Sequence, residues 1–284
     1  MNYTSRRRRN AILVHAAALF IGVCTILPVL YMVYASITPQ RDLIAVPMRW
    51  VPHTLDFSRY RTILSGGSDS VGQTFRAAFM NSLIVALVTV SLSMIVGVLG
   101  AYAFARLRFR FRRAVLFLFL GTYMLPQIAL LIPLYLIMSA LGLLDSKVGL
   151  IIVDMSLVVP FVLWMLSNYF ATIPEELEEA ARVDGTTRIG ALFRVILPAA
   201  MPGLFSTAMF ALLLAWDEFM YALIFTSSDR SKTLPVAISE FAGKYTTDFG
   251  LVAAGGLIAA IPPVLVAVAF QRYVVSGLSA GSVK

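Results

Sequence analysis

Long, nearly uninterrupted apolar runs dominate the pattern of hydrophobic and polar positions along the chain. A helix that crosses the hydrocarbon core of a bilayer, roughly 30 Å thick, needs about 20 mostly apolar residues. Runs of this kind occur at 11–37, 77–105, 114–139, 148–171, 199–226 and 249–271. Because backbone polar groups inside a bilayer must be satisfied within the segment, these runs predict α-helices. The sequence therefore predicts an all-α transmembrane fold with six membrane-spanning helices.

Prolines interrupt most of these apolar runs, and each removes a backbone hydrogen bond that a straight helix needs. They are Pro126 and Pro133 in the third run, Pro160 in the fourth, Pro198 and Pro202 at the start of the fifth, and Pro262-Pro263 in the sixth. Two interpretations stay open. The breaks are either irregularities of helix packing, or hinges and cavity linings of a transport pathway.

Composition agrees with a membrane protein, since 59% of the residues are hydrophobic and only 13% are charged. Ordinary soluble domains have about 45–50% apolar and about 25% charged residues. The net charge of +8 is expected when arginines hold the cytoplasmic face of a membrane. We therefore expect membrane lipids, and no nucleic acid, among the partners.

Arginine clusters predict on which side of the membrane each connecting segment lies. Arg6–Arg9 precede the first run, five arginines lie between 106 and 113, and three lie between 182 and 194. Basic residues in short loops resist translocation, so both chain termini are expected to be cytoplasmic. The chain then divides into a basic cytoplasmic tail at 1–10, a first span at 11–37, an extracytoplasmic segment at 38–75, a five-helix core at 76–272 and a cytoplasmic tail at 273–284.

Few residues support catalytic or metal chemistry. His15 and His53 stand far apart without cysteine or carboxylate neighbours at ligand spacing, and Cys24 is the only cysteine. The chain also lacks a GxxxxGK[ST] loop, which is the usual phosphate-binding element of an ATPase. We expect no catalytic residue, no metal and no cofactor bound by this chain.

The stretch from 172 to 198 differs from the other connecting segments because it predicts two short helices. Thr172 with Glu175 fits a capping box, Pro174 suits a first helical turn, and Gly185 is a natural stop. A second helical pattern follows, with apolar residues at i, i+3, i+4 and i+7, namely Ile189, Leu192, Phe193 and Ile196. The stretch is either an ordinary interfacial loop or a helix that lodges in a groove on a partner.

The residues of this stretch resemble the signature of binding-protein-dependent ATP-binding-cassette (ABC) importer permeases. The resemblance rests on Glu179-Ala180-Ala181, Gly185, Val195 and Leu197-Pro198 at fixed spacing, with valine where the family most often has isoleucine. It implies the type I importer permease fold, with residues 174–188 as a coupling helix between the fourth and fifth spans. The residues that it assigns to ATPase coupling are Glu178, Glu179, Ala180, Ala181, Asp184, Gly185, Leu197 and Pro198.

Further segments resemble the second permease of maltose-type carbohydrate importers. They are Asn81-Ser82, 101–106, Trp216-Asp217-Glu218-Phe219 and the tail 277–284. The resemblance implies import of an oligosaccharide, sugar or polyol across a bacterial inner membrane. It also implies a second homologous permease, two ATPase subunits that bind ATP and Mg, and an extracytoplasmic sugar-binding protein. The tail is expected to reach the ATPases.

Three carboxylates inside predicted spans, Asp154, Asp217 and Glu218, are candidates for a substrate pathway. Charged residues within spans usually face a cavity or a partner. Trp216 and Tyr221 are candidates because an aromatic ring offers sugars an apolar face and a polar handle, but an interfacial aromatic belt explains them equally well. Asn168 is a further candidate, with a contact between helices as the alternative.

The external segment 227–248 is expected either to contact the sugar-binding protein or to be a solvated connector. Other classes of transporter and enzyme also remain as alternatives. An ion-coupled transporter would use the three carboxylates as relay groups, and a membrane-embedded enzyme would need a cluster of acids or metal ligands. Permeases for amino acids, phosphate, metals or osmolytes share the coupling pattern as well.

Overall fold

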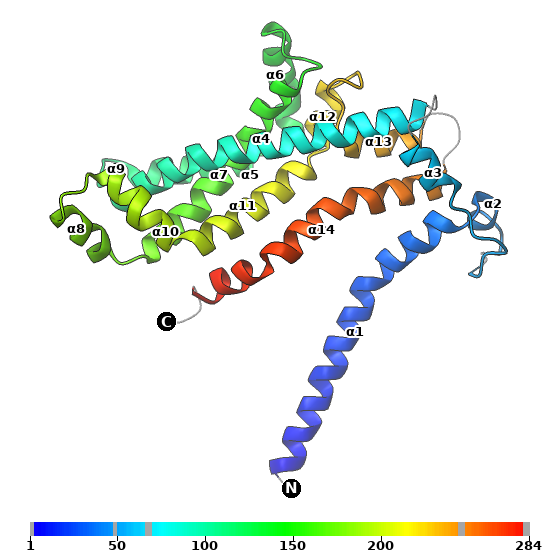
Figure 1. Ribbon diagram of the computed structural model, residues 1–284, viewed down its shortest axis with the longest axis horizontal. Helices are drawn as coiled ribbons and strands as arrows, with labels where there is room; N and C mark the ends of the chain where they lie inside the picture. Colours follow the sequence, from blue (N-terminus) through cyan, green and yellow to red (C-terminus); the bar gives the residue numbers. More distant parts are fainter. Residues whose placement is uncertain (1–2, 48–49, 66–69, 244–247, 281–284) are drawn as a thin grey trace. The chain divides into compact units, whose positions relative to one another are not determined.

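The structure is a computed structural model that describes residues 3–47, 50–65, 70–243 and 248–280, and all regular secondary structure in these ranges is helical (Figure 1). The chain forms two compact units. The first consists of Met1–Gln73 and Ile238–Ala259, and the second of Thr74–Ala237 and Ala260–Lys284. The predicted all-α fold class is confirmed.

Four described helices are long and apolar enough to cross a membrane. They are α1 (Tyr3–Ile37), α4 (Ser70–Arg106), α7 (Lys147–Thr172) and α14 (Phe249–Ala280). Two bent pairs pass the same test when each pair is taken together. The first pair is α5 (Arg112–Met124) with α6 (Gln127–Ala140), and the second joins Arg188–Ala199 to α11 (Met201–Trp216). With each pair counted as one span, the described helices make six spans.

The third apolar run is broken into two helices that meet at 94°, so the expectation of one helix over 114–139 is wrong. Pro126 causes the break, because a proline disfavours helical geometry in the residue before it. Leu125 accordingly has an extended backbone, with ψ 134°. Pro133 and Pro160, by contrast, lie inside helices that continue through them.

The fifth apolar run is also interrupted, so 199–226 is not a single helix. Helix α11 bends by 81° from the preceding helical stretch and ends at Trp216. The short helix α12 (Met220–Phe225) follows after Asp217-Glu218-Phe219. The acids Asp217 and Glu218 thus lie where α11 ends, within the apolar run. Helix α13 (Leu234–Phe241) follows further along the chain.

In the first unit, Arg59 ties the short helices after α1 to the start of α14. These helices are α2 (Gln40–Leu43) and α3 (Ser58–Leu64). Arg59 is 5% exposed, and its Nε lies 3.1 Å from the Asp248 carboxylate. It also donates hydrogen bonds to three backbone carbonyls, the shortest at 2.6 Å to Thr38. A buried arginine needs such partners because its charge is otherwise costly.

The second unit has α7 at its centre, packed against α11 and α5. Apolar residues of α7 are almost fully buried, among them Leu150, Val153, Val158, Val162 and Leu166. Helix α4 approaches α7 closely because it has Gly97 where a side chain would collide: a Cβ there would lie 2.4 Å from Val162 Cγ1. Small residues at such positions let membrane helices pack backbone to backbone.

Candidate functional site

The predicted short helix is α8 (Glu175–Val183). Its first turn carries Glu175, Glu176 and Glu178, which the positive end of the helix dipole favours. The predicted capping box does not form. Pro174 is the N-cap residue, and the Thr172 hydroxyl instead donates to the carbonyl of Tyr169 at 2.7 Å.

Gly185 ends this helix, as the sequence predicts. Its φ of +88° is a left-handed conformation that residues with a side chain adopt at a cost. The amide of Thr186 donates to the Ala181 carbonyl and the amide of Gly185 to the Arg182 carbonyl, each at 3.1 Å. These bonds satisfy carbonyls that the helix end leaves open.

Glu178 fixes α8 to the end of α4. It is only 8% exposed and accepts a 2.7 Å hydrogen bond from the Tyr102 hydroxyl. Its Oε2 also lies 3.5 Å from Nε of Arg106, the last residue of α4. Arg106 in turn donates to the carbonyl of Ile173 at 2.6 Å, just before α8 begins. This ion pair and the hydrogen bonds to charged groups hold the two helices in one geometry.

The residues predicted for ATPase coupling divide into two groups. Glu178 and Ala181 are buried against the rest of the chain, which the sequence could not show. Glu179, Ala180, Asp184 and Gly185 are exposed, Pro198 is exposed and Leu197 is partly buried. The exposed side of α8 also presents two apolar residues that were not predicted, Leu177 and Val183, the latter 87% exposed.

The second helical stretch begins at a capped turn and widens in its middle. The Thr187 hydroxyl accepts from the amide of Gly190 at 3.1 Å, which caps α9 (Arg188–Ala191). A π-helix, η1 (Leu192–Ile196), and α10 (Leu197–Ala199) follow. The predicted apolar face is therefore split: Leu192 and Ile196 are buried, but Ile189 and Phe193 are exposed. A wider turn changes the angular spacing on which the prediction rested.

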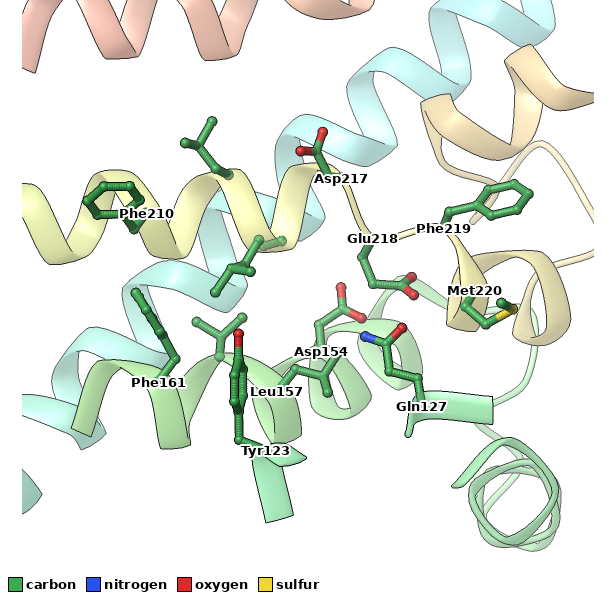
Figure 2. Close-up of a pocket in the computed structure, with 14 residues that line it drawn as sticks. Tyr123, Gln127, Asp154, Leu157, Phe161, Phe210, Asp217, Glu218, Phe219 and Met220 are labelled. Atoms are coloured by element: carbon green, nitrogen blue, oxygen red, sulfur yellow. The ribbon is translucent and has the colours of Figure 1, made fainter. Parts of the chain in front are cut away.

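A cavity of about 680 Å³ brings together the three predicted carboxylates (Figure 2). This volume is in the range of small-molecule sites, about 300–1,000 Å³. The cavity lies between α5, α6, α7, α11 and α12. Its lining residues are Tyr123, Gln127, Asp154, Leu157, Val158, Phe161, Phe210, Leu213, Leu214, Ala215, Asp217, Glu218, Phe219 and Met220.

The three carboxylates have different surroundings. Asp154 is 1% exposed, and neither carboxylate oxygen has a hydrogen-bond partner among the described residues. Glu218 accepts from the amides of Tyr221 at 2.7 Å and Ala222 at 3.0 Å, so it caps α12. Asp217 is exposed. Figure 2 shows the Asp154 carboxyl group pointing toward Glu218, with the Gln127 amide on the same side.

The other predicted pathway residues do not line this cavity. Trp216 is 5% exposed and packs edge-on against Phe79, with ring centroids 5.9 Å apart. Tyr221 is fully buried and stacks on Phe225. Asn168 is exposed on α7. The aromatic rings that do line the cavity are Tyr123, Phe161, Phe210 and Phe219, and of these the sequence analysis drew attention only to Phe219, as part of a family motif.

Residues 227–233 belong to the second unit and are fixed within it by hydrogen bonds, so they are not a free connector. Asp145 accepts hydrogen bonds from the amides of Ser227 and Ser228 and from the hydroxyls of Ser228 and Ser231, at 2.5–2.9 Å. Burial alone would raise the pKa of Asp145, but these hydrogen bonds outweigh it and hold the pKa well below its usual value.

A second set of contacts holds the same loop to α4 and α7. The side-chain amide of Asn81 donates to the carbonyls of Asp229 and Lys232, both at 2.9 Å. Lys147 donates to the Arg230 carbonyl at 2.8 Å. Further along the predicted external segment, Lys244 lies outside the described residues, as do residues 281–284 of the predicted tail.

The candidate spans and the bent helix pairs describe a polytopic membrane protein with a cavity among its helices. The chain belongs to the family of binding-protein-dependent transport system inner membrane components, which matches residues 93–280. It is therefore an inner-membrane transport component. This family membership favours a transport component over the alternatives of an ion-coupled transporter and a membrane-embedded enzyme.

Several relatives are named for the transport of sugars or sugar derivatives. The sulfoquinovosyl glycerol transport system permease of Agrobacterium fabrum is 37% identical over 94% of this chain and 92% of its own length. The trehalose/maltose transport system permease of Thermococcus litoralis is 34% identical over 96% of both chains. A solved bacterial ABC transporter for import of the acidic polysaccharide alginate contains a chain that is 28% identical, with a TM-score of 0.74, covering 96% of this chain and 99% of that one. That match confirms the importer permease fold.

Proposed function

We propose that this chain is one of two homologous permeases in an ATP-driven importer that moves a carbohydrate into the cytoplasm by alternating access. The cargo is an oligosaccharide, a sugar or a polyol. Support comes from relatives that are more than 30% identical over nearly the whole chain and are named for sugar transport. The cavity, with aromatic walls and carboxyl groups, is chemically suited to a sugar.

The partners follow from this assignment. Two ATPase subunits bind ATP and Mg and supply the energy, and an extracytoplasmic binding protein delivers the sugar. Both termini and α8 lie in the cytoplasm, on the side to which the arginine clusters belong. Residues 227–233 lie on the opposite side, where Asp145 and Asn81 hold them ready for the binding protein.

The observation that carries the mechanism is the attachment of α8 to α4. The exposed side of α8, with Glu179, Ala180 and Val183, docks on an ATPase subunit. Its buried side is held through Glu178 to Tyr102 and Arg106. A displacement of α8 by the ATPase therefore moves the end of a 37-residue helix. An ATPase can then bias two arrangements of the helices, as population shift requires.

The experiment is ATPase activity of the complete complex in proteoliposomes. This chain is co-expressed with its neighbouring permease and ATPase, and binding protein loaded with trehalose, maltose or diacetylchitobiose is added. Stimulation by one of the loaded proteins identifies the cargo. Glu179→Arg and Gly185→Pro are each expected to abolish this stimulation.

Arg113→Glu, at an exposed residue of α5 outside α8, is the matched charge reversal, and it is expected to leave stimulation intact. Membrane insertion of every variant is checked by its yield in the solubilised complex. The proposal fails if no sugar-loaded binding protein stimulates hydrolysis. The coupling role of α8 fails if the α8 variants assemble and respond like the wild type.

A further inference from the structure

We propose that the cavity admits neutral or amino glycans and rejects acidic ones, and that Asp154 and Asp217 set this preference. The inference rests on the proposed carbohydrate function and adds the charge class of the cargo. The solved alginate importer, whose permease chain shares this fold, carries an acidic polysaccharide. On this inference, the present chain uses the same fold for cargo without acidic groups.

The unpartnered carboxyl group of Asp154 is the first observation. Native proteins pair nearly all buried polar atoms, so an exception calls for an explanation. Both oxygens of Asp154 lack a partner among the described residues, although the residue is 1% exposed and lines the cavity. A cargo that presents hydroxyl or amino donors, directly or through one water molecule, would complete this group. A carboxylate or sulfonate has only acceptors to offer.

The charge of the cavity lining is the second observation. Asp154, Asp217 and Glu218 are its acidic residues, and the described residues that line it include no arginine, lysine or histidine. The amides of α12 satisfy Glu218, but no described residue donates a hydrogen bond to Asp154. Like charges repel strongly where protein and lipid exclude water. An anionic cargo would therefore enter a site that has no positive group to receive it.

The shape and walls of the cavity are the third observation. Tyr123, Phe161 and Phe210 provide aromatic surfaces, and Gln127 provides both donors and an acceptor (Figure 2). Aromatic rings accept the apolar faces of sugar rings regardless of charge, so they favour sugars in general. Discrimination between neutral and charged sugars then depends on the polar groups of the lining, which include three carboxyl groups.

Charged thiol reagents test the electrostatic preference without any knowledge of the cargo. Cys24, the only cysteine of the chain, is replaced by serine, and Leu214→Cys places a thiol at the cavity wall. The complete complex is treated with cationic trimethylammonioethyl methanethiosulfonate and with anionic sulfonatoethyl methanethiosulfonate. Each rate is divided by its rate with free 2-mercaptoethanol. We expect a normalised cation-to-anion ratio of at least about tenfold at Leu214→Cys.

Asp154→Asn and Asp217→Asn are each expected to lower this ratio by about threefold or more. Ser227→Cys provides the control, because Ser227 is an exposed residue outside the spans and outside the cavity lining, and its ratio should not respond to Asp154→Asn. If the Asp154→Asn complex does not assemble, the ratio measured with Asp217→Asn tests the proposal. A normalised ratio near one, as expected if a basic residue of the second permease neutralises Asp154, overturns the proposal.

Protection by sugars tests the glycan part and bypasses the binding protein. Trehalose and glucosamine at about 100 mM are expected to slow labelling of Leu214→Cys by threefold or more, whereas glucuronate has no effect. Equal protection by glucuronate overturns the inference. If no sugar protects while the reagent ratio stays high, the proposed carbohydrate function fails and the charge preference of the cavity stands.

Discussion

At the scale of single residues, Glu178 gives the sharpest prediction for coupling. Glu178→Gln keeps the size of the side chain but removes the charge opposite Arg106, whose side chain is 4% exposed. Leaving a buried charge without its partner costs about 3–5 kcal/mol in a fully buried pair, and less is expected here because Glu178 is partly accessible. We expect basal ATPase activity to persist while stimulation by loaded binding protein falls at least fivefold.

Tyr102→Phe is the companion to this variant, because it removes only the hydroxyl that donates to Glu178 at 2.7 Å. A hydrogen bond to a charged group is worth about 1.5–3 kcal/mol, so a smaller loss of stimulation is expected. The two variants are compared in the same ATPase assay. Full stimulation in both would show that α8 does not depend on this attachment.

Asp145 gives a prediction about pH. Its pKa in the folded protein lies well below the unfolded value of about 3.9, because serine amides and hydroxyls satisfy the carboxylate. The ionised group therefore stabilises the fold at every pH above about 4, and this contribution is lost as the pH falls through the folded pKa. Asp145→Asn should lower the thermal midpoint of the solubilised complex at pH 7, with the difference from wild type shrinking below pH 4.

Ser156→Ala serves as the control for Asp145→Asn, since the Ser156 hydroxyl donates to the Val153 carbonyl of its own helix and to no other described residue. It should leave the thermal midpoint nearly unchanged at each pH. A constant difference between wild type and Asp145→Asn from pH 7 to pH 3.5 would contradict the proposed role of the carboxylate charge.

At the scale of helices, the end of α8 can be tested at Gly185. A Cβ at this position would meet open space, so Gly185→Ala acts only through its positive φ, at a cost of about 1–2 kcal/mol. We expect a partial loss of stimulated ATPase activity, smaller than that of Gly185→Pro. Gly121→Ala in α5, where a Cβ also meets nothing within 4 Å, should improve helix propensity and leave coupling unchanged.

The helices also show how far apolar patterning reaches. Apolar run length located the four long candidate spans, because hydrophobic thickness fixes the length of a membrane helix. The third and fifth runs instead form bent pairs of shorter helices. Proline alone did not locate the breaks: Pro126 separates two helices, whereas Pro133 and Pro160 do not. Neighbouring helices can compensate a missing hydrogen bond, and a single sequence does not show which neighbours are available.

The candidate site was also predictable only in part. The acids Asp154, Asp217 and Glu218 stood out because charge is rare within spans, and they do line one cavity. Trp216 could not be distinguished from a packing residue, since its orientation depends on Phe79 in another helix. The inward orientation of Glu178 depends likewise on Tyr102 and Arg106, which are distant in sequence. Tertiary contacts of this kind leave no local pattern.

At the scale of the whole molecule, the spans bury little of their own surface. The most apolar 18-residue stretch of α1 is 0% buried, that of α14 17%, that of α4 33% and that of α7 50%. Lipid covers part of this surface, and a second permease is expected to cover another part. Large exposed apolar areas mark membrane or protein contacts.

The orientation of the whole chain is the last prediction, and cysteine labelling of intact cells tests it. In the Cys24→Ser background, Ser227→Cys and Val183→Cys each provide an exposed position on one predicted side of the membrane. Arginine clusters place the side that holds Val183 in the cytoplasm. A membrane-impermeant maleimide that crosses only the outer membrane should label Ser227→Cys at once, and Val183→Cys only after the inner membrane is opened. Labelling in the reverse order would show that the chain has the opposite orientation in the membrane. In that orientation α8 would face away from the ATPases and could not couple to them.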